Sequence, residues 1–154
     1  MDAVQDFEDL LALFEKHEVR YLIIGGLAFI YHAKPRYTKD MDLWVEFESE
    51  NLARANVALS EFGSPALLSV EKDDEVLQLG FAPNRIDLFL RVVGVHFPDA
   101  WKTRVQGSYG AVRAHWIGLD TLLQIKSGIA KPKHQEDARV LREVKSMKKH
   151  LREE

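Results

Sequence analysis

The stretch that decides the fold of this 154-residue chain is Tyr21-Leu-Ile-Ile-Gly-Gly-Leu-Ala-Phe-Ile-Tyr-His32. Its first part, up to Ile24, is an apolar run typical of a buried strand, and the part from Leu27 onward is compatible with a helix. The glycine pair between them predicts a turn in which the backbone can approach another group closely. The helix start that follows offers unpaired N–H groups and the positive end of the helix dipole. The stretch therefore predicts a phosphate cradle.

A second strand, Met41-Asp-Leu-Trp-Val-Glu46, is predicted after Pro35 ends the helical pattern. Residues two apart on a strand point to one face, so Asp40 and Asp42 should project together. Two adjacent carboxylates repel each other, and a divalent cation relieves that repulsion. Oxygen ligands of this kind suit Mg²⁺ or Mn²⁺. The pair therefore predicts a metal site at the entrance of this strand.

A third carboxylate, Asp87, stands in the strand-like run Arg85-Ile-Asp-Leu-Phe-Leu90. An aspartate between apolar neighbours either faces solvent on an edge strand or serves a site, because an unpaired buried charge is costly. If this strand lies beside the one that carries Asp40 and Asp42, the three carboxylates can hold two metal ions. A set of this kind is typical of phosphoryl transfer.

The spacing of the glycines, the paired aspartates and the later single aspartate resembles that of minimal nucleotidyltransferases of the polymerase-beta superfamily. The chain is most similar to small stand-alone bacterial members of the abortive-infection and toxin–antitoxin type. The matching positions are Gly25, Gly26, Ala28, His32, Arg36, Thr38, Asp40, Asp42 and Asp87.

A second matching segment lies near the C-terminus, and with it the resemblance covers roughly residues 19–141. It comprises Leu122-Leu-Gln-Ile-Lys126, Lys131-Pro-Lys133 and Glu136-Asp137. The chain departs from the pattern where many relatives have a serine at the second glycine position, here Gly26, or a glycine after the histidine, here Ala33. The usual hydroxyl contact to a phosphate is therefore missing at position 26.

The resemblance implies an α+β fold of the polymerase-beta type, with a mixed, mostly antiparallel sheet flanked by helices. It also implies C-terminal helices over about residues 118–150. Asp40, Asp42 and Asp87 are the expected catalytic and metal-binding residues of a two-metal site for Mg²⁺ or Mn²⁺. The expected nucleotide-binding residues are Gly25, Gly26, Arg36, Thr38, Lys126 and Lys133. From the residues alone, Arg36 is equally suited to a salt bridge that holds the loop. Thr38 favours a structural hydrogen bond at the strand entrance.

The activity implied is transfer of a nucleoside monophosphate from an NTP such as ATP to an acceptor hydroxyl, with release of pyrophosphate. The acceptor is an RNA such as a tRNA end, a partner protein, or a small molecule such as an aminoglycoside or lincosamide. A toxin–antitoxin role would bring an antitoxin partner, and a second copy in a homodimer is another way to complete the cleft. The alternative is a non-catalytic, antitoxin-like module that binds a nucleotide or a partner.

Composition agrees with a single domain spanning residues 1–154. The chain has no cysteine, so disulfides and thiolate metal sites are excluded. We expect a cytoplasmic protein with no membrane span, because no apolar run reaches the roughly twenty residues a span needs. The net charge of −3 gives no overall basic surface for nucleic acid. The basic run 145–152 is either a local patch for a polynucleotide or a helix end that complements the helix dipole.

The remaining pattern predicts a first helix with one apolar face and a further helix over residues 48–62. A hairpin is expected from residues 66–70 and 75–81 around the turn at 72–74. A short helix at 98–102 and a strand region at 105–114 should follow. The apolar face of the first helix consists of Phe7, Leu10, Leu11 and Phe14.

Overall fold

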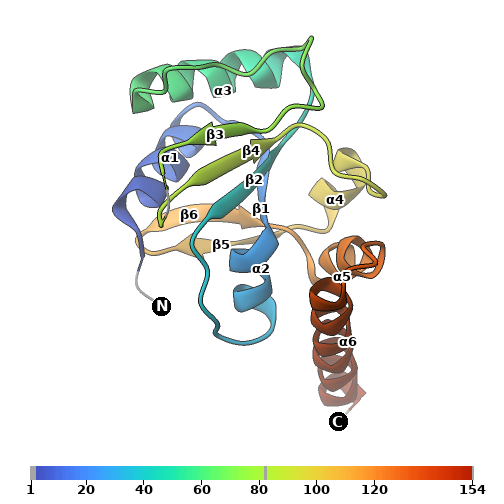
Figure 1. The fold of residues 1–154 in the computed structure, drawn as a ribbon. Coiled ribbons are helices and arrows are strands. Elements are labelled where there is room, and N and C mark those ends of the chain that lie inside the picture. The colour runs from blue at the N-terminus through green and yellow to red at the C-terminus, as the bar shows by residue number, and fades with distance from the viewer. Residues whose placement is uncertain (1–2, 82, 154) are drawn as a thin grey trace.

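The fold is described by a computed structural model, which places residues 3–81 and 83–153. Within these residues the strands form one sheet in the order β3-β4-β2-β1-β6-β5 (Figure 1). The strands are β1 (Tyr21–Ile24), β2 (Met41–Val45), β3 (Leu77–Leu79), β4 (Ile86–Phe89), β5 (Val105–Tyr109) and β6 (Val112–Trp116). The helices are α1 (Gln5–Lys16), α2 (Gly25–His32), α3 (Ser49–Phe62), α4 (Phe97–Lys102), α5 (Leu119–Ser127) and α6 (Pro132–Glu153).

The sheet is mixed, as predicted. Strand β1 pairs antiparallel with β2, and the outer pairs β3–β4 and β5–β6 are also antiparallel. Strand β2 runs parallel to β4, and β1 runs parallel to β6. The parallel pairs require crossover connections, which α3 and the long segments after β1 and β2 supply.

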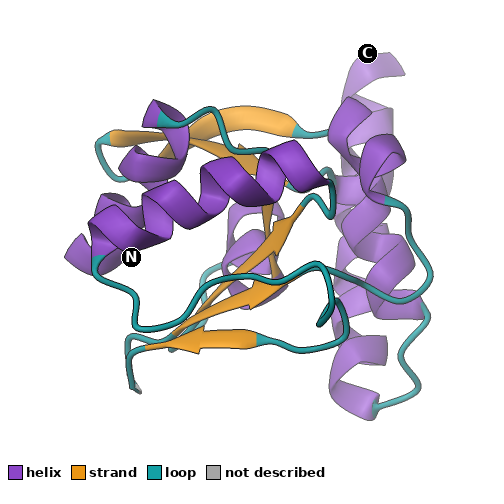
Figure 2. Cartoon of the chain, turned by 90° about the horizontal axis from the view of Figure 1, so that it is seen from above, coloured by secondary structure: helices purple, strands orange, loops and turns teal. Residues whose placement is uncertain are grey.

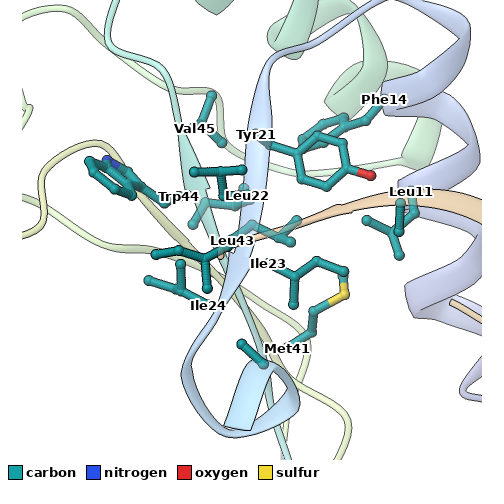
Figure 3. Close-up of a cluster of buried hydrophobic side chains, with 14 of the residues drawn as sticks. Leu11, Phe14, Tyr21, Leu22, Ile23, Ile24, Met41, Leu43, Trp44 and Val45 are labelled. Carbon is teal, nitrogen blue, oxygen red and sulfur yellow. The ribbon is translucent and has the colours of Figure 1, made fainter. Parts of the chain in front are cut away.

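The two central strands are covered on both faces, and every residue of β1 is buried. Side chains alternate across a strand, so Tyr21 and Ile23 share one face, and Leu22 lies on the other. Figure 3 shows Tyr21 against Phe14 of α1, with ring centroids 5.4 Å apart, and Trp44 on the opposite side of the strands. Helix α1 packs against α3 and β6, whereas α2 packs against α5 and α6 (Figures 1 and 2).

The predicted C-terminal helices are confirmed as α5 and α6, and the structure shows that α6 is only partly packed. Leu141 is fully buried, but residues 142–152 are exposed or half-buried. Figure 1 shows this end of α6 extending away from the sheet. Among residues 3–81 and 83–153, no helix combines the length and the apolar character needed to cross a bilayer.

The predicted hairpin at residues 66–81 is wrong, because only Leu77–Leu79 forms a strand there, and it pairs with β4. The side chain of Asn56 on α3 explains the difference. Its Oδ1 accepts from the backbone N–H of Leu68 at 2.8 Å, and its Nδ2 donates to the carbonyl of Leu68 at 3.0 Å. The backbone groups of Leu68 that a strand would pair in the sheet are therefore satisfied by α3.

The other predicted elements are confirmed with small shifts in their ends. Helix α3 follows Glu48, whose carboxylate accepts from the backbone N–H groups of Glu50 and Asn51 at 2.9 and 2.8 Å. Helix α4 and the β5–β6 hairpin appear at the expected places, and Gly110 makes the hairpin turn with φ +57°. A non-glycine residue rarely adopts that φ.

Asn51 is a fully buried polar residue that joins the entrance of β1 to the end of β2. Its Oδ1 accepts from the N–H of Arg20 at 2.7 Å. Its Nδ2 donates to the carbonyls of Arg20 and Glu46, each at 3.0 Å. The two carbonyls also accept from the backbone N–H groups of Glu46 and Glu48, at 3.1 and 3.0 Å, so the N–H of Arg20 is the group that relies on Asn51.

We expect Asn51→Ala to lower the free energy of unfolding by about 3 kcal/mol, because it removes three hydrogen bonds at a buried position and leaves the N–H of Arg20 without its partner. Urea denaturation followed by circular dichroism measures the change. Ser146→Ala, on the exposed part of α6, serves as the control and should cost less than about 0.5 kcal/mol. Equal stabilities for the two variants would contradict this role of Asn51.

Candidate functional site

Three aspartates gather where β2 and β4 begin. The parallel register sets Asp42 of β2 directly opposite Asp87 of β4. Side chains at paired positions of neighbouring parallel strands point to the same face, about 4.8 Å apart at the backbone. Asp40 lies two residues before Asp42, so it approaches the same face. Asp87 is buried, and Asp40 and Asp42 are half-buried. The structure thus brings together the three carboxylates that the sequence predicted as a group.

Arg85 lies within this carboxylate cluster, a position that sequence reasoning missed. Its Nε donates to Asp87 Oδ1 at 2.9 Å, and its Nη2 lies 3.0 Å from both Asp87 Oδ2 and Asp40 Oδ2. The hydrogen bonds and charge of Asp87, with help from Asp40, raise the pKa of Arg85, so the guanidinium stays charged. The sequence signal that could have identified Arg85 is its position two residues before Asp87, because strand alternation puts both side chains on one face.

The carboxylates are only partly compensated by this arginine. Burial raises the pKa of Asp42 to about 6, and the charges of Asp87 and Asp40 add to the effect, while Arg85 and Lys126 oppose it. Asp40 Oδ1 is buried and has no hydrogen-bond partner among the described residues. A buried carboxylate oxygen without a partner is costly. The cluster therefore holds more negative charge than its protein surroundings neutralise.

These observations fit the hard oxygen ligands that Mg²⁺ and Mn²⁺ prefer. Within residues 3–81 and 83–153, however, no three His, Cys, Asp or Glu side chains stand together in an arrangement that could hold a metal ion. The guanidinium of Arg85 offers a physical reason, because it engages both oxygens of Asp87 and one of Asp40. The three aspartates supply a suitable donor set, and Arg85 holds two of them, Asp40 and Asp87.

The glycine pair lies against the carboxylates and the following loop. Gly25 is the first residue of α2 and has φ +68°, and a Cβ there would stand 2.2 Å from Asp42 Oδ2. A Cβ on Gly26 would stand 2.7 Å from Thr38 Oγ1. Neither position can take a side chain while its neighbour stays in place. The hydroxyl of Thr38 therefore lies in the space that the first atom of a side chain at position 26 would need.

Arg36 and Lys126 meet at a buried carboxylate, Asp137 of α6. Arg36 donates to both oxygens of Asp137, at 2.7 and 3.1 Å, and Lys126 Nζ lies 2.9 Å from Oδ2. Burial alone would raise the pKa of Asp137, but these hydrogen bonds hold it below its usual range. The guanidinium of Arg36 also lies 4.1 Å from the centre of the Phe29 ring. This ion triad connects the loop before β2 to both C-terminal helices.

Lys133 does not join the triad. It is exposed in the first turn of α6, and within the described part of the chain its side chain makes no hydrogen bond or ion pair. The structure therefore groups Gly25, Gly26 and Thr38 near the carboxylates and ties Arg36 to Lys126, while Lys133 points to solvent. Their assignment as nucleotide-binding residues stays a prediction.

His32 closes α2 against the end of β6. Its Nε2 lies 2.6 Å from the carbonyl oxygen of Ile117. Because a carbonyl only accepts, Nε2 must carry the proton. Burial lowers the pKa of His32, although the hydrogen bond to Ile117 works in the opposite direction and the charge of Lys148 adds to the lowering. The structure gives this motif residue a packing role.

No protein-family model and no curated protein matches the chain. Similar solved structures include the lincosamide antibiotic adenylyltransferase LnuA with lincomycin bound, at TM-score 0.60 and 16% identity over 93% of this chain and 99% of that one. ANT(2″)-Ia in complex with adenylyl-2″-tobramycin gives TM-score 0.54 and 12% identity over 96% and 95%. An antigenic nucleotidyltransferase-like protein from Paracoccidioides brasiliensis gives 0.52 and 13% over 90% and 73%. The chain has the nucleotidyltransferase fold, as predicted.

We expect Asp137→Asn to lower the free energy of unfolding by about 3 kcal/mol, because it leaves two cations without their shared buried counter-charge. Chemical denaturation of the folded protein measures the loss. The neighbouring Glu136→Gln is the matched control, since Glu136 forms an exposed ion pair with Arg139, and should cost less than about 1 kcal/mol. A small loss for both variants would show that the triad does not hold α6 in place.

A second prediction concerns pH. Because the pKa of His32 is lowered in the folded state, the unfolded chain binds more protons below pH 6.5, and stability contributed by neutral His32 is lost as pH falls. His32→Gln keeps an N–H that can reach the carbonyl of Ile117 but does not titrate. The stability of the wild type should therefore fall relative to this variant between pH 7.5 and 5.5, as urea denaturation at each pH would show. A constant difference between the two proteins would contradict the assignment.

Proposed function

We propose, with the nucleotidyltransferase fold as the premise, that the protein transfers a nucleoside monophosphate from an NTP to an acceptor hydroxyl and releases pyrophosphate. The observation that carries the proposal is the convergence of Asp40, Asp42 and Asp87 beside Gly25 at the start of α2. A purely structural cluster has no need of three carboxylates on one face, since like charges destabilise the fold. A phosphoryl-transfer site does need them.

Asp40, Asp42 and Asp87 are the residues that would hold Mg²⁺ or Mn²⁺. Such ions, when bound, would neutralise charge on the transferred phosphoryl group and make the acceptor hydroxyl easier to deprotonate. The partnerless Oδ1 of Asp40 and the raised pKa of Asp42 support this role, because both mark carboxylates that would gain from a cation.

The donor triphosphate would lie along the N-terminus of α2. Gly25 and Gly26 carry no side chains, so phosphate oxygens can reach their backbone N–H groups, and the helix dipole favours the anion. Thr38 adds a hydroxyl next to Gly26. Arg36 and Lys126 are held by Asp137 close to this loop, and they would balance the charge of the triphosphate and fix its orientation.

For the acceptor, a small molecule with a free hydroxyl is our first candidate. The structures of LnuA and ANT(2″)-Ia, which match nearly the whole chain, were solved with an antibiotic and an adenylylated antibiotic. An RNA acceptor is supported by a different feature, a hollow of about 360 Å³ whose lining includes Lys145, Lys148, Lys149 and Arg152 of α6. The assay must therefore offer both kinds of acceptor.

The alternative is a non-catalytic module that binds a nucleotide or a partner protein. A binding role needs no complete carboxylate set, so the three aspartates favour the enzyme. Calorimetry with ATP distinguishes the enzyme from the non-catalytic module. A module would bind ATP equally well with and without Mg²⁺ and leave it intact, whereas the enzyme should need the metal.

We expect Asp42→Asn to reduce nucleotidyl transfer by at least about a thousandfold while leaving the fold intact, because it removes a charge from the centre of the reacting site. The assay uses α-labelled NTPs, Mg²⁺ and pools of aminoglycosides, lincosamides and RNA, and it measures both product formation and pyrophosphate release. Exposed Asp9 of α1 provides the matched control, and Asp9→Asn should keep full activity. Absence of transfer to every acceptor, together with identical behaviour of wild type and Asp42→Asn, would refute the proposal.

A further inference from the structure

Arg85 is the only cation in hydrogen-bond contact with the aspartate cluster among the residues that the structure describes. Its backbone is fixed, because its carbonyl accepts from the N–H of Met41 at 2.9 Å. Its side chain, by contrast, is 34% exposed. The guanidinium can therefore turn toward solvent without any movement of the strand.

We propose that Arg85 is a built-in counter-cation, which holds the aspartate cluster together in the free protein and must leave when a divalent cation binds. The inference rests on the proposed function, since it concerns the same carboxylates. Arg85 is in this account a positioning residue. It sets the order of binding, so that the metal enters with the nucleotide and not before it.

Geometry makes Arg85 and a metal ion competitors for the same oxygens. The planar guanidinium forms a two-point contact with Asp87, one hydrogen bond to each oxygen, and a third contact with Asp40 Oδ2. A carboxylate engaged on both oxygens in this way has fewer lone pairs free for another cation. A divalent ion would also meet the positive charge of the arginine at close range. The free protein should therefore bind a metal ion weakly.

A bound triphosphate changes this balance in two ways. It adds negative charge beside the aspartates, which strengthens binding of a divalent ion, because Mg²⁺ sites in proteins commonly combine a few carboxylates with substrate phosphates. It also offers Arg85 new acceptors, since a guanidinium binds phosphate oxygens as well as it binds carboxylates. The arginine can thus move from Asp87 and Asp40 to the nucleotide without losing its hydrogen bonds.

The test measures binding of Mn²⁺ alone, by the loss of the electron paramagnetic resonance signal of free Mn²⁺ during a titration without nucleotide. We expect Arg85→Gln to bind Mn²⁺ about tenfold more tightly than the wild type, because a competing cation is gone. Arg91→Gln is the matched control. Arg91 follows β4 closely and forms an exposed pair with Asp73, so its removal should leave Mn²⁺ binding unchanged.

Two further measurements keep the test decisive. Without metal, Arg85→Gln should melt below the wild type, and added Mg²⁺ should raise its melting temperature more than that of the wild type. In the unaltered protein, the Arg85 Nε–H resonance should shift when Mg²⁺ and a non-hydrolysable ATP analogue are added together, but not with Mg²⁺ alone. This second readout does not depend on whether the variant folds.

Failure of this inference differs from failure of the proposed function. If Arg85→Gln and the wild type bind Mn²⁺ equally, and Asp42→Asn weakens Mn²⁺ binding in both backgrounds, the aspartates hold the metal. Arg85 is then a permanent ion-pair partner of the aspartates and does not compete with the metal. An Arg85 resonance that stays unchanged with metal and nucleotide would likewise overturn the inference. If Asp42→Asn has no effect on Mn²⁺ binding in either background, the metal site itself is absent and the proposed function fails with it.

Discussion

The parallel pairing of β2 with β4 is the constraint on which the site depends. It places Asp42 opposite Asp87 at one strand spacing, and the backbone bond from Met41 to Arg85 holds the two strand entrances level. A shift of either strand by one residue would turn its aspartate to the other face of the sheet, among the buried side chains that pack toward α1. The hydrophobic cores on both faces therefore fix the carboxylates as well as the fold.

Gathering three acidic groups in one place has an energetic cost, and the surrounding structure offsets only part of it. Arg85 pairs its single positive charge with Asp87 and Asp40, and the start of α2 brings its dipole toward Asp42 next to Gly25. The raised pKa of Asp42 and the partnerless oxygen of Asp40 show what is left over. The repulsion among the carboxylates therefore lowers the stability of the folded protein, and a bound cation would offset it. Functional sites commonly carry such a cost in stability.

The ion triad of Arg36, Asp137 and Lys126 adds a connection that no short motif describes. It spans the loop before β2, the end of α5 and the start of α6, so the C-terminal helices are coupled to the loop that carries Thr38. Isolated lysines near helix ends are usually solvated, so Lys126 gave no local signal of burial. Its partner lies eleven residues further along the chain, beyond the reach of any helix spacing rule. Lys133, in contrast, behaves as an isolated lysine near a helix end usually does.

Much of the fold was predictable because local pattern and tertiary packing agree. The apolar run before the glycines, the apolar neighbours of Asp42 and the apolar face of α1 are each buried, as their periodicity predicts. Helix α3 buries Leu52, Ala55 and Leu59 as its pattern predicts, but Val57 is exposed. The hairpin at residues 66–81 was not predictable in the same way, since the side chain of Asn56 takes the hydrogen bonds that a strand would have used. A competing partner far away in the chain leaves no trace in a local pattern.

The sequence by itself determined the chemical inventory of this protein: a glycine pair after a buried strand, two aspartates at strand spacing and a third on a later strand. Those features follow from residue type and period, which act over a few neighbours. Only the tertiary structure decided the register of β2 against β4, the place of Arg85 between two aspartates and the pairing of Lys126 with Asp137. Each of these depends on how distant segments meet, and that is settled by the burial of whole faces and the pairing of buried charges, not by any local preference.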